Sequence, residues 1–455
     1  MTNKSIPYQS FCWVIGTTSF RTAKLNLKIE AQLLLLDEFY NEVIKKSNWN
    51  WNNELQEKYY DFMKNKAFLT GDAKRKDKDA REKTSGLVDI GLITEDRLIT
   101  DAGRNLLKIT SSGDFEPNNV FNINRDSFIY LKQLLKTSID VSGSIVRPFI
   151  AVIKCLTELE FLSYDEFTYF VPLIIDYESA KQIISDIKLY REGKISPEEI
   201  IYKRLMQMDN YKLAREEFIA SDVDENLICL VGMNRKSRSY DKPYYKLYEN
   251  LKKVFLDGIS DYESLLNSAK NINQKPGTLW RSLIFKTTNI GVVRKNGKSS
   301  IHKQCPFINC KNETELKKVF FKYLHVFKAM ATLSDYFDLN RRYFNITDTL
   351  IFEDCMIKLD MIPKYYFKEI IDVLYTETFS RDDKLRADAP LDNISEAFKL
   401  DISKVYAALS KDLGITIKSP EQAATYVNDE RYRRFNTLID KKFNDSVLVE
   451  LLNCF

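Results

Sequence analysis

Residues 86–107, GLVDIGLITEDRLITDAGRNLL, carry the pattern on which the fold prediction depends. An apolar helix end is followed by two short apolar runs, at 92–94 and 97–100, and an acidic turn separates them. Thr100 and Asp101 are residue types that begin helices as N-caps, so a further helix is predicted after them. Helix, hairpin and helix in this order indicate a winged helix-turn-helix, a module that contacts either DNA or other proteins.

A second segment repeats this plan in residues 340–375, NRRYFNITDTLIFEDCMIKLDMIPKYYFKEIIDVLY. It predicts a strand, an acidic turn at Glu353 and Asp354, a strand at 355–359 and a helix from about Pro363. The 455 residues include only 14 glycines and 11 prolines, too few turn residues for a sandwich, barrel or propeller. The predicted fold class is therefore mainly α with small β-hairpins, in which helical linker segments join tandem winged helix-turn-helix subdomains.

Polar stretches and changes of pattern divide the chain into four predicted domains. They are an N-terminal winged-helix domain (1–111), a helical domain (121–225), a second winged-helix-type domain with a basic insertion (226–375) and a helical linker (376–455). Since chains of this length usually contain two to four domains, this division is of the expected size.

Helical spacing of apolar residues predicts further helices at 26–46, 53–66, 125–190 and from 312 onwards, with a helix start at Ser196. NLICLVGM, residues 226–233, is a strand candidate. GVVRKNGKSSI, residues 291–301, predicts a hairpin whose turn is Asn296-Gly297. The last residues, 438–455, have an apolar helical pattern without a cap, so we expect that the chain has been cut there.

The composition and the N-terminus limit the class of protein and its location. The net charge is only +4, from 68 Lys+Arg and 64 Asp+Glu, so local clusters rather than a global field would hold an anionic partner. The N-terminus lacks the regions of a signal peptide, and no apolar run approaches the ~20 residues that cross a bilayer. Seven scattered cysteines suit free thiols in a reducing compartment. We therefore expect a cytoplasmic protein without a membrane partner.

The sequence contains no phosphate-binding glycine loop, nucleophile elbow or HExxH motif. His325, one of only two histidines, lies among apolar residues and is expected in the core. HKQCPFINC (302–310) offers three zinc ligands, but structural zinc needs four, so a turn with two free thiols is the simpler interpretation. Asp176, Asp186 and Lys188 imitate a PD-(D/E)xK nuclease motif, yet the apolar spacing around them is helical. No catalytic residue and no metal ligand is predicted.

Positive charge gathers in residues 64–83, where eight Lys and Arg accompany four Asp and Glu. Their excess of four equals that of the whole chain. A basic loop beside a winged helix can neutralise phosphates and fix the register of a protein on duplex DNA. A solvated lysine-rich loop is the alternative interpretation.

Three shorter stretches add basic residues. Residues 235–246 combine Lys and Arg with tyrosines, Arg341 and Arg342 precede the second hairpin, and GTTSFR (16–21) places hydroxyls and an arginine before a helix. A plain capping turn is the alternative for GTTSFR. The candidate DNA-binding residues are Thr17, Thr18, Arg21, Lys74, Arg75, Lys76, Arg81, Lys83, Arg235, Lys236, Arg238, Arg341 and Arg342.

Several segments occur together in an order that one enzyme family shares. They are WVIGTTSFR (13–21) followed by IEAQL (29–33), the basic segment leading into 86–107, and LSDYFDLNRRYF (333–344) followed by LIFED and KLDMIPKYYFKEI (358–370). In this order the chain resembles the AlwI-like type IIS restriction endonucleases and their nicking relatives.

This resemblance implies a function and a division of labour. In the family, N-terminal winged-helix subdomains recognise a short asymmetric site in double-stranded DNA, and a separate PD-(D/E)xK domain with Mg²⁺ cuts a few base pairs away. This chain is expected to stop before that domain, so no cleavage residue is carried over and no cofactor is expected in it. A second nuclease subunit or a second copy would complete double-strand cleavage.

The resemblance and the charge pattern together suggest roles for single residues. Arg21, Arg75, Arg81 and a side chain in 80–90 are expected to reach DNA, while the lysines of 64–83 bind phosphates. Two other classes stay open. A winged-helix transcriptional regulator would dimerise on a palindromic site, and a helical protein-interaction scaffold would show no salt-dependent binding to DNA.

Overall fold

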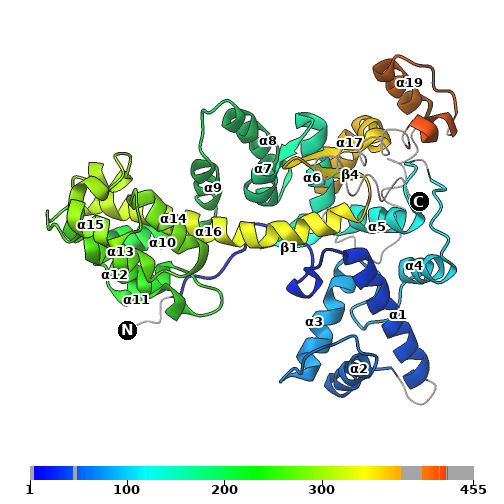
Figure 1. Cartoon of the computed structure of the whole chain (residues 1–455), viewed down its shortest axis with the longest axis horizontal. Helices are drawn as coiled ribbons and strands as arrows, with labels where there is room; N and C mark the ends of the chain where they lie inside the picture. Colours follow the sequence, from blue (N-terminus) through cyan, green and yellow to red (C-terminus); the bar gives the residue numbers. More distant parts are fainter. Residues whose placement is uncertain are drawn as a thin grey trace, which may run out of the picture. The chain divides into compact units, whose positions relative to one another are not determined.

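The computed structural model divides into two compact units, each assembled from three separate stretches of sequence (Figure 1). It describes residues 5–44, 49–119, 121–380, 402–419, 421–426 and 428. The first unit is Met1–Val14, Ile139–Val146 and Tyr164–Asn340, and the second unit is Ile15–Ser138, Arg147–Ser163 and Arg341–Phe455. Because the chain passes repeatedly from one unit to the other, neither unit corresponds to a single continuous segment.

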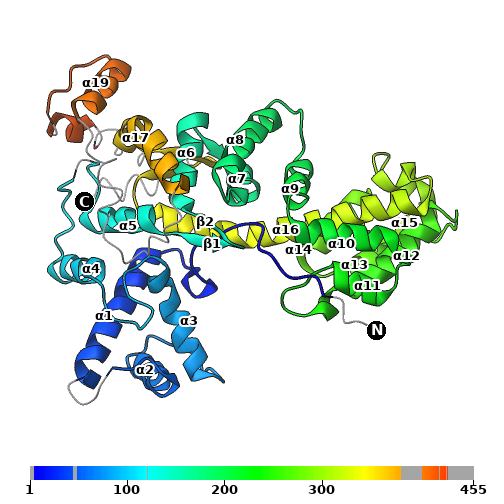
Figure 2. The same cartoon turned by 180° about the vertical axis from the view of Figure 1, so that it is seen from behind.

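The second unit is mainly helical. Its elements are η1 (Thr18–Phe20), α1 (Leu25–Ile44), α2 (Asn53–Asn65), α3 (Lys76–Asp89), α4 (Asp101–Ser112), α5 (Arg125–Lys136), α6 (Pro148–Leu159), β3 (Leu162–Ser163), β4 (Leu350–Glu353), β5 (Met356–Leu359), α17 (Met361–Ser380) and α19 (Ile402–Leu413). Helices α1, α2 and α3 pack on one another, as Figures 1 and 2 both show. Ile29, Leu33 and Leu36 recur at helical spacing on α1 and are buried, which confirms the predicted helix.

The stretch 86–107 forms a helix, a tight turn and a helix. After α3, Ile93 and Ile99 form a single antiparallel bridge, so the two predicted strands are reduced to one pair of residues. Thr100 caps α4 as predicted, since its hydroxyl accepts a hydrogen bond from the Gly103 amide at 3.3 Å. The Trp49 indole also donates to the carbonyl of Asp96 at 2.7 Å, which holds this turn against the unit. A winged helix-turn-helix is not confirmed by a bridge of this size.

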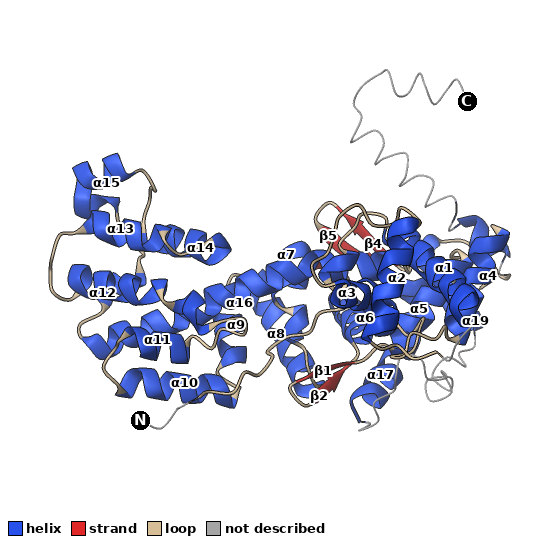
Figure 3. Cartoon of the chain, turned by 90° about the horizontal axis from the view of Figure 1, so that it is seen from below, coloured by secondary structure: helices blue, strands red, loops and turns tan. Residues whose placement is uncertain are grey.

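The hairpin predicted before the last described helices is present. β4 and β5 pair antiparallel, from Leu350 opposite Leu359 to Glu353 opposite Met356. β3 pairs with the other side of β5, giving a three-stranded sheet in the order β3-β5-β4. Figure 3 shows β4 and β5 of this sheet. The turn lies at Asp354 and Cys355, one residue later than predicted, and both have positive φ (49° and 58°), as two-residue hairpin turns require.

The first unit consists of short helices, a small hairpin and most of one long helix (Figure 2). Its elements are β1 (Ile139–Val141), β2 (Ser144–Val146), α7 (Tyr164–Tyr169), η2 (Val171–Leu173), α8 (Tyr177–Arg191), α9 (Pro197–Leu205), α10 (Asp209–Ala220), α11 (Glu225–Val231), η3 (Arg238–Asp241), α12 (Pro243–Phe255), α13 (Tyr262–Lys270), α14 (Gln274–Ile284), α15 (Ile290–Asn296), η4 (Gly297–Ser300), η5 (Pro306–Asn309) and α16 (Glu313–Asn345). Trp280 stacks on Phe307 and contacts Phe320, so α14, η5 and α16 share one buried core.

Helix starts that the sequence predicts are confirmed here. Ser196 caps α9 with a capping box, in which its hydroxyl accepts from the Glu199 amide and the Glu199 carboxylate accepts from the Ser196 amide. Asp186 and Lys188 lie within α8 and not on a strand, as their spacing indicated.

Three predictions of local structure are wrong. The strand candidate NLICLVGM is helix α11, because the Asp224 carboxylate accepts from the Leu227 amide at 2.7 Å and caps a helix there. The predicted hairpin 291–301 is α15 followed by η4, since Gly297 (φ +49°) ends the helix instead of forming a hairpin turn. The region 125–190 also contains the unpredicted hairpin β1–β2, which turns at Ser142 and Gly143.

The predicted helix at 438–455 lies outside the described residues. Among the helices that the structure does describe, none has both the length and the apolar character needed to cross a bilayer. The predicted domain boundaries stay a prediction.

Candidate nucleic-acid interface

Residues from three distant sequence segments meet in the second unit. Gly16 has a positive φ of 74°, and the ring of Tyr343 lies where a side chain at this position would be. Gly86 of α3 likewise leaves no room for a Cβ, because Phe20 and the Tyr343 hydroxyl pack directly against it. Two glycines therefore allow the 16–21 loop, α3 and the end of α16 to approach closely.

The GTTSFR loop is held against α3. The hydroxyl of Thr17, which is half-buried, lies 3.4 Å from the Ser85 hydroxyl that donates to it. Thr18 begins the short helix η1, and Arg21 follows it with an exposed side chain. The backbone carbonyl of Thr17 accepts from the amide of Phe20 at 3.0 Å, so a capping turn is also present. Arg21 is therefore more exposed than Thr17.

Most positive charges of segment 64–83 are paired with carboxylates inside the protein. Lys64 pairs with Asp72, Lys66 with Glu38 (3.0 Å), Arg75 with Asp77 (2.7 Å), Lys76 with Asp61 (2.7 Å), Lys78 with Glu82 (3.6 Å) and Arg81 with Asp77 (3.5 Å). The Arg75 guanidinium, which donates two hydrogen bonds to Asp77, lowers the pKa of that carboxyl to about 2. Two of the carboxylates, Glu38 and Asp61, come from α1 and α2, outside the basic segment. The positive field of this segment is therefore weaker than its sequence suggests.

Lys74 and Lys83 differ from their neighbours. Among the described residues, neither ammonium group has an ion pair or a hydrogen bond. Lys74 is exposed on the loop before α3, whereas Lys83 is half-buried on α3 and faces a cavity. These two lysines are therefore well placed to accept an external phosphate.

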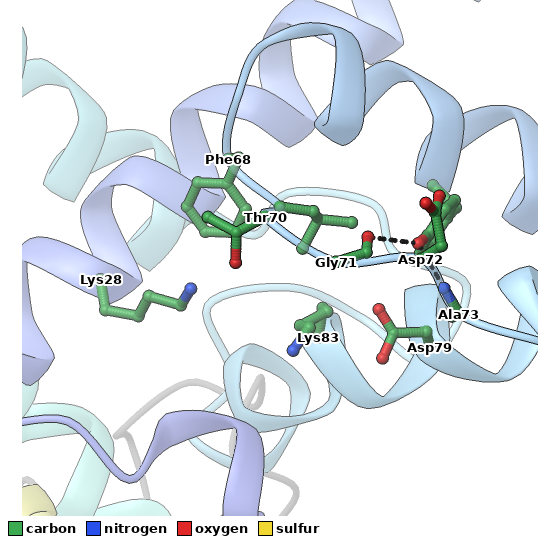
Figure 4. A pocket seen from close by; sticks show the side chains of 10 residues that line it. Lys28, Phe68, Thr70, Gly71, Asp72, Ala73, Asp79 and Lys83 are labelled. Carbon is green, nitrogen blue, oxygen red and sulfur yellow. Dashed lines mark hydrogen bonds between the residues drawn. The ribbon is translucent and has the colours of Figure 1, made fainter.

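A cavity of about 400 Å³ lies between α1, α2, α3 and the 66–75 loop (Figure 4). Its lining includes Lys28, Thr70, Asp79 and Lys83. The Lys28 ammonium also lies 3.9 Å from the centre of the Phe68 ring. Burial lowers the pKa of Lys28, the nearby charge of Lys83 lowers it further, and Asp79 opposes both effects. The sequence prediction named Lys83 but missed Lys28 and Thr70, since neither lies in a basic run.

The 235–246 cluster forms an exposed loop on the first unit. The side chains of Arg235, Lys236 and Arg238 are exposed, and Tyr240 keeps 64% of its surface in solvent. Arg235 stacks over the ring of Tyr8 at 5.5 Å. Aromatic and cationic groups side by side on one exposed loop can bind a nucleic acid by stacking and by charge.

The two lysines that follow this loop form ion pairs, and both ends of the loop are held by contacts with α16. Lys242 pairs with Glu225 at 2.7 Å, and Lys246 pairs with Glu249 at 3.1 Å. At the end of η3, Asp241 is buried and pairs with Lys328 of α16 at 2.8 Å. The Lys328 ammonium also donates to the carbonyl of Gly232, so both ends of the loop are tied to one side chain.

The remaining candidate residues lie in less accessible places. Arg341 and Arg342 are half-buried at the end of α16, next to the fully buried Tyr343. Burial raises the pKa of the Tyr343 hydroxyl well above its usual range, and the charge of Asp89 adds to this effect. The two arginines therefore belong to a packed region rather than to an open surface.

Several residues considered for chemistry are buried in the protein. His325 is buried between the rings of Phe321 and Tyr211, as its apolar surroundings predicted. Cys305 and Cys310 are buried free thiols on either side of η5. Asp186 is buried and pairs with Lys203 at 3.2 Å. Within the described residues, no group of three or more His, Cys, Asp or Glu side chains could hold a metal ion.

Comparison with known proteins defines the class and then the family. A mainly helical chain with exposed basic loops is compatible with many nucleic-acid enzymes and regulators, so the fold alone does not decide among them. A family model described as AlwI restriction endonuclease matches residues 88–454. The chain therefore belongs to the AlwI restriction endonuclease family, a family of restriction enzymes. No curated protein matches it.

The matched range bears on two expectations. It extends to residue 454, so the match gives no support to the expectation that the C-terminal part of the family pattern is missing. It begins at residue 88, so the 16–21 loop and the basic segment 64–83 precede it.

Proposed function

We propose that this chain recognises a short asymmetric site in double-stranded DNA as part of a type IIS restriction endonuclease. Membership of the AlwI restriction endonuclease family is the observation that carries this proposal. In the proposal, α3, the turn after it and α4 act as a winged-helix reader, and the exposed cations nearby bind the DNA backbone.

The distribution of unpaired cations supports the proposal. Lys74 on the second unit, and Lys236 and Arg238 on the first, are exposed and free of ion pairs to described residues. Phosphate contacts of this kind supply most of the non-specific affinity of DNA-binding proteins. Arg75 and Arg81 would have to leave Asp77, or bind DNA while sharing it, because both are already paired with that buried carboxylate.

In the proposal, a PD-(D/E)xK site with Mg²⁺ cleaves the DNA a few base pairs from the recognised sequence, and a second copy or a second nuclease subunit cuts the other strand. A site of this type needs clustered carboxylates as oxygen ligands for the metal. The described residues contain no group of three or more His, Cys, Asp or Glu side chains that could hold a metal ion, so they offer no cluster of that size for Mg²⁺.

Selection from random duplex DNA tests the proposal. The chain is incubated with the pool at two salt concentrations, bound duplexes are sequenced, and the same pool is run on a gel after incubation with Mg²⁺. We expect enrichment of one short asymmetric sequence, with binding that weakens as salt increases.

The other outcomes point to other functions. A palindromic site bound by a dimer, without cleavage, would identify a winged-helix regulator. No binding that depends on salt would instead indicate a protein-interaction scaffold. Cleavage in the Mg²⁺ arm would place the nuclease site in the chain itself.

A further inference from the structure

Hydrogen bonds and an ion pair within the protein hold one wall of the cavity in the second unit. The Tyr60 hydroxyl donates to the carbonyl of Gly71 at 3.0 Å and accepts from the amide of Ala73 at 2.7 Å, so it holds the loop that forms one side. Lys64 on α2 pairs with Asp72 of the same loop. These contacts shape a recess rather than a flat surface, and the recess is about 400 Å³ in volume.

Two cationic side chains face this recess. Figure 4 shows the Lys28 ammonium, the Thr70 hydroxyl and the Lys83 side chain around one common space. Among the described residues, no carboxylate forms an ion pair with either lysine. Two ammonium groups that share a recess repel each other unless an anion lies between them.

The charges of the lining define the kind of anion. Asp72 is neutralised by Lys64, which leaves Asp79 as the one unpaired carboxylate of the described lining against two lysines. A single negative charge from outside would therefore make the recess neutral. A phosphodiester carries one negative charge, whereas a free phosphate group at neutral pH approaches two. Thr70 can add a hydroxyl donor to either kind of phosphate oxygen.

We propose that this recess binds one phosphodiester group of the DNA backbone, held by Lys28 and Lys83 together and by the hydroxyl of Thr70. This inference rests on the proposed function, because it assigns a backbone contact to a DNA-binding chain. It adds Lys28 and Thr70, which lie outside the basic runs, to the residues of the interface. It also makes α1 and α3 joint supports of a single contact.

The test compares K28Q, K83Q and the double variant in the full chain. Binding to a mixed-sequence duplex is measured over a range of salt, and the slope of log affinity against log salt is compared with wild type. The slope falls by about 0.9 for each phosphate that the protein no longer neutralises. Because both lysines hold the same phosphate, we expect each single variant to weaken binding and the slope of the double variant to fall by only about 0.9 in total.

Two lysines on separate phosphates would instead lower the slope of the double variant by about 1.8, which would overturn the shared site. Unchanged slopes in all three variants would overturn any contact with DNA, while leaving the proposed function intact if wild type still binds. Failure of wild type to bind any duplex would overturn both. The melting temperature of each variant is measured as well, so that unfolding is not mistaken for weaker binding.

Removal of the negative charge of Asp79 should change the affinity for DNA in the opposite direction from the lysine variants. D79N removes the one unpaired negative charge of the described lining, so we expect it to bind the duplex more tightly than wild type. The matched controls are K58Q and E54Q, which change the same charges within an exposed ion pair on α2, away from the recess. An effect of D79N no larger than that of E54Q would contradict the proposal.

A final arm separates a DNA phosphate from a free one. Inorganic phosphate is compared with chloride at equal ionic strength, and the melting temperature is recorded for wild type and K83Q. If phosphate stabilises wild type through Lys83 while the DNA salt slope is unchanged in the variants, the recess binds a free phosphate, and the assignment to DNA is wrong. If DNA binding alone depends on the two lysines, the assignment stands.

Discussion

His325 shows how one buried side chain sets a dependence of stability on pH. Its ring lies 4.3 Å from that of Phe321 between centres, and its Nε2 has no hydrogen-bond partner among the described residues. Burial lowers the pKa of His325 well below its usual value, and the positive charge of Lys328 adds to the effect. The folded protein therefore holds a neutral ring, while the unfolded chain takes up a proton below about pH 6.5.

The first prediction follows from this difference in proton binding. Because the folded-state pKa is depressed, the stabilisation is complete above pH 6.5 and is lost as the pH falls. The free energy of unfolding should fall by up to about 1.4 kcal/mol per pH unit below 6.5, and H325F should remove that part of the fall. Urea denaturation at several pH values measures it. H302Q, which changes the only other histidine, is the control, and an equal effect of both variants would refute the prediction.

At the scale of elements, the contact between α1 and α5 brings two buried acidic side chains together. Glu30 and Asp126 are both buried, and the Tyr130 hydroxyl donates to Glu30 at 3.2 Å. Burial raises the pKa of Glu30 to about 7, and the charge of Asp126 raises it further. A raised carboxyl pKa stabilises the fold at low pH, and this stabilisation is lost as the pH rises through about 7.

E30Q should therefore be more stable than wild type at pH 8, by up to about 3 kcal/mol, with a gain of no more than about 1 kcal/mol at pH 5. Thermal melts at the two pH values measure the difference. E42Q, on an exposed face of the same helix, should leave stability unchanged at both. A gain from E30Q that is equal at pH 5 and pH 8 would show that ionisation is not its cause.

The third prediction concerns the close approach of the 16–21 loop and the end of α16. An alanine at Gly16 would combine a left-handed backbone with a methyl group directed at the Tyr343 ring. G16A should destabilise the protein by roughly 2–4 kcal/mol. G71A is a suitable control, because Gly71 has no neighbour within 4 Å of an added Cβ. Denaturant titration of both variants would contradict the argument if their losses of stability were alike.

At the scale of the whole molecule, unpaired charges rather than all basic residues should determine binding to DNA. In the 235–246 stretch, Arg235, Lys236 and Arg238 are exposed, while Lys242 and Lys246 are paired with carboxylates. The triple variant R235Q/K236Q/R238Q should lower the salt slope for a mixed-sequence duplex by up to about 0.9 for each phosphate that it no longer binds. K242Q/K246Q, from the same stretch, should change it less. If K242Q/K246Q lowered the slope more than the triple variant, the ion pairs of Lys242 and Lys246 would have to break when the protein binds DNA.

The sequence was most informative where a local signal has one physical meaning. Thr100 and Ser196 predicted helix starts because a hydroxyl at an N-cap satisfies free amides whatever surrounds it. Asn296-Gly297 misled because glycine with positive φ serves both hairpin turns and helix ends. The charge balance of 64–83 also misled, since Glu38 and Asp61 reach it from other helices. The recess could not be predicted from the sequence for the same reason. Lys28 and Lys83 lie on different helices, and only the fold brings them together.

The division of each unit into separate stretches has a consequence for synthesis on the ribosome. Gly16 emerges more than three hundred residues before Tyr343, the side chain that packs on it, and β3 emerges long before its partner β5. N-terminal domains usually fold while the rest of the chain is being synthesised. The second unit cannot fold completely in this way, because it includes residues from near both ends of the chain. This unit can complete its packing only after residues 341–359 have left the exit tunnel.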